Sequence, residues 1–158
     1  EILARTGWTS GELLAAAEQH CFLPVYDWVS LLIGVNDQYR GLPLPAYKSN
    51  LNRLMEMAFK CGGERASRLL VISIPDWGHT PFAHGRDLAA ISRAIDDFNA
   101  VNKELALSNG FHYLDITESS RQRPLDPGML ASDGLHYSAL AYASWAEEIN
   151  TLILNQVP

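Results

Sequence analysis

The sequence predicts an α/β fold in which a parallel β-sheet lies between two layers of helices, a three-layer αβα sandwich. Short apolar runs alternate with longer amphipathic segments along the chain, and this alternation is typical of strands connected by helices. The chain has 158 residues, of which 47% are hydrophobic, so it can bury a sizeable core. No repeat, low-complexity tract or linker divides it, which indicates one domain.

Each element follows from its local pattern. A short apolar segment at residues 2–5 predicts a first strand, and Thr9 and Glu12 form a capping-box pattern that places a helix start just after Gly7. Continuous apolar runs predict buried strands, and segments with helical periodicity predict helices. The remaining expected strands are 26–33, 68–74 and 111–115, and the expected helices are 10–19, 46–60, 87–108 and 138–154.

Composition excludes some classes of function. A net charge of −6 gives no electrostatic case for binding nucleic acid, and no apolar stretch approaches the ~20 residues of a membrane span. Cys21 and Cys61 lack the CxxC spacing of a zinc site, and we expect both to be ordinary, partly buried thiols. Neither charge nor cysteine usage chooses between a cytoplasmic and an exported protein.

An apolar run at residues 29–33 ends in Gly34 and is followed by Asn36 and Asp37. Ligands of open α/β sheets bind outside the carboxyl ends of the strands, so both polar residues emerge where chemistry is usually done. An asparagine there can aim its amide at a developing oxyanion. The same Gly-x-Asn-Asp pattern also occurs as an ordinary strand-ending turn, and this alternative stays open.

The stretch Asp133-Gly134-Leu135-His136 places an acid three residues before a histidine. An aspartate that accepts from one imidazole nitrogen fixes the tautomer and leaves the other nitrogen free to take a proton from a hydroxyl. Asp133 and His136 therefore supply two members of a hydrolytic triad, provided that the turn curls back on itself. The alternative is that Asp-Gly is only a turn and His136 caps the following helix.

Together, Gly34-Val35-Asn36-Asp37 and Asp133-Gly134-Leu135-His136 resemble two sequence blocks of the SGNH hydrolases, also called the GDSL esterase and lipase family. The two blocks stand in the family's order and at a similar separation. The resemblance implies a flavodoxin-like αβα fold and acyl transfer to water without a cofactor. Residues 33–41 and 73–82 read most like a lysophospholipase-like subgroup.

The segment Thr6-Gly7-Trp8-Thr9-Ser10 is similar to the family's glycine block. The resemblance therefore implies that the Gly7 backbone N–H joins the Asn36 amide in an oxyanion hole, while His136 moves the proton and Asp133 orients it. The alternative for Gly7 is a glycine that only relieves a tight turn.

The family's first block, a Gly-Asp-Ser motif that carries the nucleophile, is absent from this chain. In the family's sheet its strand lies beside the strand expected at residues 26–33, so its absence would leave a gap with unpaired groups that cost about 1–3 kcal/mol each. We therefore expect an upstream segment of about 30–50 residues, comparable to one βα unit, that completes the sheet. Residues 1–158 are interpreted as one SGNH-hydrolase domain that is N-terminally incomplete.

Three serines within the chain are less suited to act as the nucleophile. Ser10 falls in the first turn of a helix, Ser73 lies inside an apolar run, and Ser132 stands beside Asp133. None has the strained turn that presents a nucleophile.

Substrate contacts are expected from two loops. Asp37 and Tyr39 follow Asn36 at the mouth of the pocket, and Trp77 and His79 lie in a long connection at residues 75–85 whose aromatic and polar composition suits a pocket wall. The aromatic residues of that connection could equally serve only to fasten it to the core.

Asp76 is expected to organise the same connection. His79 and His84 do not have the spacing of a helical zinc pair, so we predict no metal site. In the second long connection, residues 116–132, Arg121 and Arg123 are expected to be solvated.

The resemblance implies a serine esterase or lipase that cleaves a small-molecule acyl ester. The alternative is a non-catalytic ligand-binding module, or an inactive fragment, on the same fold. A nucleotide binder is disfavoured because no Gly-rich phosphate loop follows a strand. The sequence does not separate carboxylesterase, thioesterase, lysophospholipase and carbohydrate deacetylase activities, and it does not reveal the oligomeric state.

Overall fold

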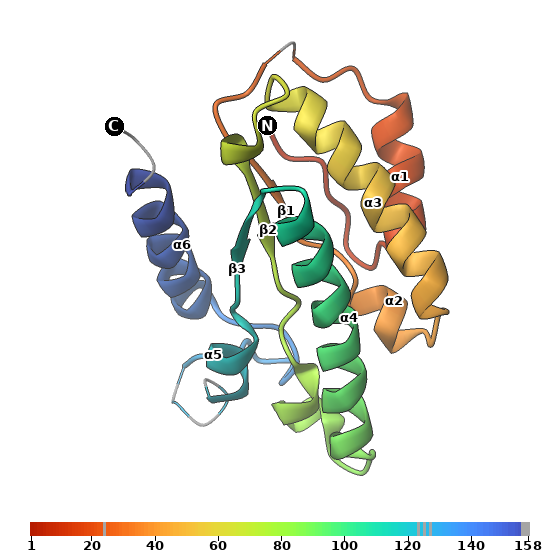
Figure 1. Cartoon of the computed structure of the whole chain (residues 1–158). Helices are drawn as coiled ribbons and strands as arrows, with labels where there is room; N and C mark the ends of the chain where they lie inside the picture. Colours follow the sequence, from red (N-terminus) through yellow and green to blue (C-terminus); the bar gives the residue numbers. More distant parts are fainter. Residues whose placement is uncertain (24, 123, 125, 127, 156–158) are drawn as a thin grey trace.

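The computed structural model describes the whole chain except residues 24, 123, 125, 127 and 156–158 (Figure 1). Its described strands form one parallel sheet in the order β1-β2-β3. They are β1 (Val29–Leu31), β2 (Leu69–Ile72) and β3 (His112–Leu114). Because the strands are parallel, their carboxyl ends open at the same edge of the sheet.

Helices cover both faces of this sheet, which confirms the predicted three-layer α/β fold (Figure 1). None of the described helices is long and apolar enough to cross a bilayer. On one side lie α1 (Ser10–Gln19), α3 (Leu44–Cys61) and α4 (Leu88–Ser108), and on the other lies α6 (Ala139–Leu154). The shorter elements are α2 (Val35–Tyr39), α5 (Thr117–Gln122) and the 3₁₀ turns η1 (Ala66–Arg68), η2 (Trp77–His79) and η3 (Pro81–Ala83).

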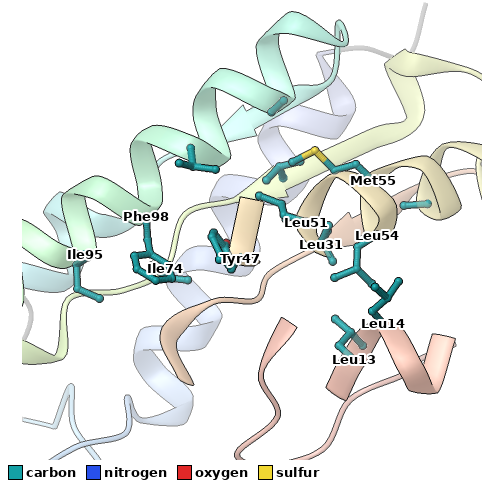
Figure 2. Packing of buried hydrophobic residues seen from close by; sticks show 14 of the residues in the cluster. Leu13, Leu14, Leu31, Tyr47, Leu51, Leu54, Met55, Ile74, Ile95 and Phe98 are labelled. Carbon is teal, nitrogen blue, oxygen red and sulfur yellow. The ribbon is translucent and has the colours of Figure 1, made fainter. Parts of the chain in front are cut away.

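The two faces of β2 belong to two different hydrophobic clusters. Successive side chains of a strand point to opposite faces, so Leu69 and Val71 pack under α3 and α4, while Leu70 and Ile72 pack against α6. Figure 2 shows the first cluster, to which α3 contributes Tyr47, Leu51, Leu54 and Met55 at helical spacing. A strand buried on both faces explains the unbroken apolar run in its sequence.

Local capping fixes where the long helices begin. The predicted capping box is present at α1, where the Thr9 side chain accepts from the Glu12 N–H and the Glu12 carboxylate accepts from the Thr9 N–H. At α4 and α6 only the N-cap side chain takes part: Asp87 accepts from the Ala90 N–H and Ser138 accepts from the Ala141 N–H. Side-chain caps satisfy N–H groups that have no partner within the helix, and they are readable from sequence because they are local.

The predicted strand at residues 2–5 is wrong. This segment is irregular and Ile2 is 91% exposed, because no described strand runs beside it and a strand requires a hydrogen-bonding neighbour. The other strands form but are shorter than predicted at both ends. Cys21 and Cys61 are free thiols; Cys61 is partly buried, which raises its pKa, but Cys21 is exposed, contrary to expectation.

A groove follows the edge of β1 that faces away from β2. It has a volume of about 210 Å³ and is lined mainly by apolar side chains of α1, α3, β1 and the N-terminal residues, among them Leu3, Phe22, Val29 and Leu54. Ser30 in the middle of β1 is exposed, and Leu32 just after it is 44% exposed. Unpaired backbone groups beside an apolar groove can accept a further strand.

Candidate active site

Asp133 and His136 meet in a tight turn that leads into α6. Oδ1 of Asp133 accepts from the backbone N–H groups of Leu135 and His136, both at 2.9 Å, and Oδ2 lies 2.6 Å from Nδ1 of His136. The bond from the imidazole, followed by those two N–H groups, lowers the pKa of Asp133 to about 2. The turn therefore curls back as the sequence required, and Gly134, at φ +67°, supplies the left-handed residue that it needs.

Bonds to three other segments hold this turn in place. The Ala131 N–H donates to the His136 carbonyl at 2.8 Å, and the Phe82 N–H donates to the Gly134 carbonyl at 3.0 Å. The neighbouring Tyr137 hydroxyl donates to the Ser120 carbonyl at 2.8 Å. The imidazole side chain is 61% exposed, and no described residue forms a hydrogen bond or ion pair with its Nε2, which leaves that nitrogen open to solvent.

Asn36 lies in the first turn of α2, which directly follows the end of the β1 segment. Gly34 begins this turn at φ +124°, and a Cβ there would lie 2.6 Å from the Tyr47 hydroxyl oxygen, so only glycine fits. The Tyr47 hydroxyl donates to the Ile33 carbonyl at 2.9 Å, and this bond holds the segment just before Gly34 in place. The short helix replaces the loop that the sequence suggested.

The loop of Gly7 lies against α2. One Nδ2–H of Asn36 donates to the Trp8 carbonyl at 2.9 Å, and Arg40 donates to the Gly7 carbonyl at 2.6 Å. Gly7 has φ +84°, a conformation that favours glycine. The structure thus holds the Gly7-Trp8 loop against α2, although Trp8 and Asn36 are 28 positions apart, and the amide of Asn36 retains a second N–H.

Asp37 does not face the substrate side. Its carboxylate accepts from the Ser10 N–H at 2.7 Å and from the Ser10 hydroxyl at 2.5 Å, and the side chain is 1% exposed. A buried carboxylate with both oxygens bonded has no surface for substrate, so the predicted substrate contact of Asp37 is wrong. Asp37 instead fastens the start of α1, and with it the Gly7 loop, to α2.

The connection at residues 75–85 joins the two halves of the site. Trp77 is buried, its indole N–H donates to Oε1 of Gln38 in α2 at 2.7 Å, and its ring lies 5.3 Å from that of Tyr39. Tyr39 and Phe82 are 47% and 38% exposed. Trp77 therefore fastens the connection to the core, and its burial leaves little surface for the predicted substrate contact, whereas Tyr39 and Phe82 are exposed. A pocket wall at this connection stays a prediction.

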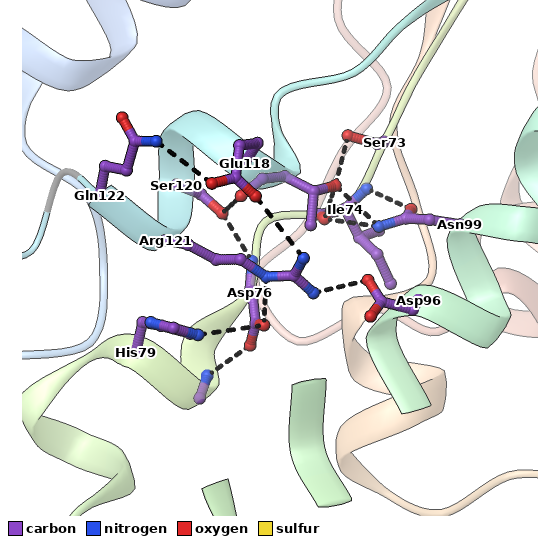
Figure 3. Close-up of polar contacts among 12 residues, drawn as sticks. Ser73, Ile74, Asp76, His79, Asp96, Asn99, Glu118, Ser120, Arg121 and Gln122 are labelled. Atoms are coloured by element: carbon purple, nitrogen blue, oxygen red, sulfur yellow. Dashed lines mark hydrogen bonds and ion pairs between the residues drawn. The ribbon is translucent and has the colours of Figure 1, made fainter. Parts of the chain in front are cut away.

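Asp76 organises the base of this connection, as predicted (Figure 3). It is fully buried; Oδ1 accepts from the Gly78 N–H at 2.8 Å and Oδ2 accepts from Nε of Arg121 at 3.0 Å. His79 is partly exposed, and its Nε2 lies 3.9 Å from the same Oδ2. The expectation that Arg121 is solvated is wrong: its side chain is 22% exposed and also binds Asp96 at 2.5 Å. Arg123 lies outside the described residues.

Two of the three candidate serines are committed elsewhere. The Ser10 hydroxyl binds Asp37, and Ser73 is fully buried, with its oxygen accepting from the Ile116 N–H at 2.8 Å. Ser132 is exposed beside Asp133. Within the described part of the chain, no group of three or more His, Cys, Asp or Glu side chains is placed to hold a metal ion.

An imidazole oriented by a carboxylate on one nitrogen and open on the other can move a proton to and from a hydroxyl. Such a pair on a parallel α/β sheet, in a chain that also has a glycine loop and an asparagine amide after a strand, is what the resemblance to the SGNH hydrolases predicts. The chain belongs to the GDSL-like Lipase/Acylhydrolase family, whose sequence profile matches residues 1–143.

Comparison with individual proteins agrees with this assignment. An acetylxylan esterase from Geobacillus stearothermophilus is 28% identical over 145 residues, which are 87% of this chain and 64% of that protein. The chain therefore spans just under two thirds of this relative's length.

Solved structures share the fold. The crystal structure of an acetylxylan esterase from Geobacillus stearothermophilus superposes with a TM-score of 0.71 at 22% identity, covering 93% of this chain and 68% of that one. An α/β hydrolase enzyme from the metagenome of Lake Arreo in Spain gives 0.71 at 17% identity, covering 96% and 71%. None of these relatives is named as a lysophospholipase, so that subgroup stays a prediction.

Proposed function

We propose that the protein is an esterase that hydrolyses small acyl esters through a Ser-His-Asp mechanism. The observation that carries this proposal is the 2.6 Å contact between Asp133 and Nδ1 of His136, with Nε2 facing solvent. Membership of the GDSL-like family and the acetylxylan esterase relative support ester hydrolysis, and the relative makes an acetyl group the first acyl group to test.

The nucleophile is proposed to be a serine on a segment outside these 158 residues. The groove along β1 supports this, because a strand laid there would extend the sheet and end at the same carboxyl edge as Asn36. The strand of such a segment would pair with the free edge of β1 and pack on the apolar side chains of α1 and α3.

The proposed reaction uses the described residues in sequence. His136 takes the proton of the serine hydroxyl as the oxygen bonds to the ester carbonyl carbon, and Asp133 balances the imidazolium charge. The Gly7 N–H, the free Nδ2–H of Asn36 and the serine's own N–H would donate to the oxyanion. His136 then returns the proton to the departing alcohol, and water repeats the cycle to release the acid.

Labelling with a fluorophosphonate tests this proposal. The full-length protein should gain one adduct, seen as a mass increase of the intact polypeptide, and peptide mapping should place it on a serine upstream of Gly7. The His136→Ala variant should lose the adduct, and His84→Ala, which changes an exposed histidine, should keep it. An adduct on Ser10, Ser73 or Ser132 would overturn the upstream nucleophile, and no adduct would favour the binding module.

A further inference from the structure

Tyr39, Trp77, Phe82 and Arg86 form a compact surface unit, which we call the Arg86 cluster. The guanidinium carbon of Arg86 lies 5.6 Å from the ring centre of Tyr39 and 5.3 Å from those of Trp77 and Phe82. A cation this close to three aromatic rings is attracted by their electron-rich faces and loses much of its freedom to move. The backbone N–H of Arg86 also donates to the Ala83 carbonyl at 3.0 Å.

The Arg86 cluster contacts both halves of the candidate site. Tyr39 stands three residues after Asn36 on α2. Phe82 donates its backbone N–H to the carbonyl of Gly134, inside the turn that carries His136, at 3.0 Å. A substrate held between Asn36 and His136 would therefore have the exposed rings of Tyr39 and Phe82 beside it.

The charge of Arg86 is not neutralised by the protein. Arg40 and Arg121, which also serve this site, pair with Glu12 and Asp76, whereas no described carboxylate pairs with Arg86. A guanidinium attracted to aromatic rings through its charge still has N–H groups to donate, and these match a carboxylate or phosphate through two parallel hydrogen bonds.

We propose that the Arg86 cluster is the leaving-group subsite and that it selects esters whose leaving group carries a carboxylate or phosphate. The assignment to the leaving group follows from chemistry: His136 must protonate the departing oxygen, so the departing group lies on the His136 side, where Phe82 is bonded. This inference rests on the proposed esterase function.

Two esters test it: 4-acetoxybenzoate, which is an anion, and its neutral methyl ester. Because the methyl ester also releases the more acidic phenol, the readout is the change that a substitution causes in the ratio of the two kcat/KM values. The Arg86→Met variant should lose about tenfold or more on the anion and little on the neutral ester. Arg93→Met removes an exposed charge on α4 and should leave the preference unchanged. Equal losses on both esters in Arg86→Met would overturn the subsite.

A binding experiment separates this inference from the proposed function. The anionic product 4-hydroxybenzoate should bind the unmodified protein, as followed by calorimetry, and should bind Arg86→Met and Arg86→Gln at least tenfold more weakly. Raising the salt from about 0.05 to about 0.5 M should weaken binding to the unmodified protein by screening. If neither ester is hydrolysed but this Arg86-dependent binding persists, the subsite stands and the esterase fails. Binding that ignores both salt and Arg86 would overturn the subsite.

Discussion

Asp76 and Asp133 each stand three residues before a histidine, yet the two pairs differ in burial and in the group that binds the second carboxylate oxygen. Asp133 is exposed and lies 2.6 Å from Nδ1 of His136, with backbone N–H groups on its other oxygen. Asp76 is fully buried and gives one oxygen to Gly78, while the other is 3.0 Å from Arg121 and 3.9 Å from His79.

The difference shows that a cation from elsewhere in the chain determines whether the carboxylate of an acid–histidine pair binds its imidazole. Arg121 lies on α5, 45 residues after Asp76. Its Nε is 3.0 Å from Oδ2 of Asp76, closer than the His79 imidazole at 3.9 Å. That carboxylate holds a loop together. With no such cation, Asp133 has His136 as its main partner and fixes the orientation of the ring.

Replacing each histidine gives the largest expected contrast. His136→Ala removes the proposed base, and kcat/KM for 4-nitrophenyl acetate should fall about 10⁴-fold in the full-length protein. His79→Ala, on the wall of the proposed pocket, should raise KM a few-fold and leave kcat unchanged. A comparable fall in kcat for both variants would refute the assignment of roles.

Replacing each aspartate should have the opposite pattern of effects: the Asp76 variant should lose more stability than the Asp133 variant. Asp76→Ala leaves the Arg121 charge without its buried partner and should lower the free energy of unfolding by about 3 kcal/mol in urea titrations. Asp133→Ala removes an exposed carboxylate and should hardly move the urea midpoint. Equal shifts for the two variants would show that burial does not separate the pairs.

Asn36 lies on α2, away in sequence from the turn that carries Asp133 and His136, and a variant of it tests the other half of the site. Asn36→Ala removes a proposed oxyanion donor, and kcat should fall about 10²-fold with little change in KM. Asn52→Ala, which removes an exposed amide bonded to Glu56 on α3, is the matched control and should behave like the unmodified protein. An unchanged kcat in Asn36→Ala would remove Asn36 from the mechanism.

The smallest expected effect is a dependence of the stability of the protein on pH. The folded pKa of Asp133 is about 2, below the ordinary value of 3.8, so the stabilisation from its bonds is present above about pH 4 and is lost as the pH falls toward 2. NMR titration of the Asp133 carboxyl carbon should give this low pKa, and His136→Ala should raise it toward 3.8. No rise in that variant would mean that the backbone N–H groups alone cause the shift.

Much of the fold could be predicted because its signals are local. Thr9 and Glu12 mark the start of α1, and the apolar run at 69–72 marks a strand that is covered on both faces. The strand at residues 2–5 could not be predicted correctly, because a strand depends on a neighbour and that neighbour is absent from the described residues. The predicted ends of the other three strands were also wrong, because the length of a strand likewise depends on its hydrogen-bonding neighbour.

The candidate site likewise has some features that the local sequence predicts and others that it does not. The Asp133 turn was predictable, since three residues and a glycine suffice to bring the carboxylate to the imidazole. The burial of Asp37 was not, because Ser10 lies 27 residues away and carries no mark of its partner. Arg86 was missed altogether, since its three rings come from α2 and from two turns after β2.

The family, the order of the long helices and of the three described strands, and the acid–histidine turn were readable from the sequence, because each depends on residues close together in the chain. The tertiary structure alone decided which carboxylate serves which cation, that Asp37 supports the Gly7 loop, and that β1 keeps a free edge beside an apolar groove. Those outcomes depend on which distant groups are buried against one another, and burial sets whether a charge must find a partner.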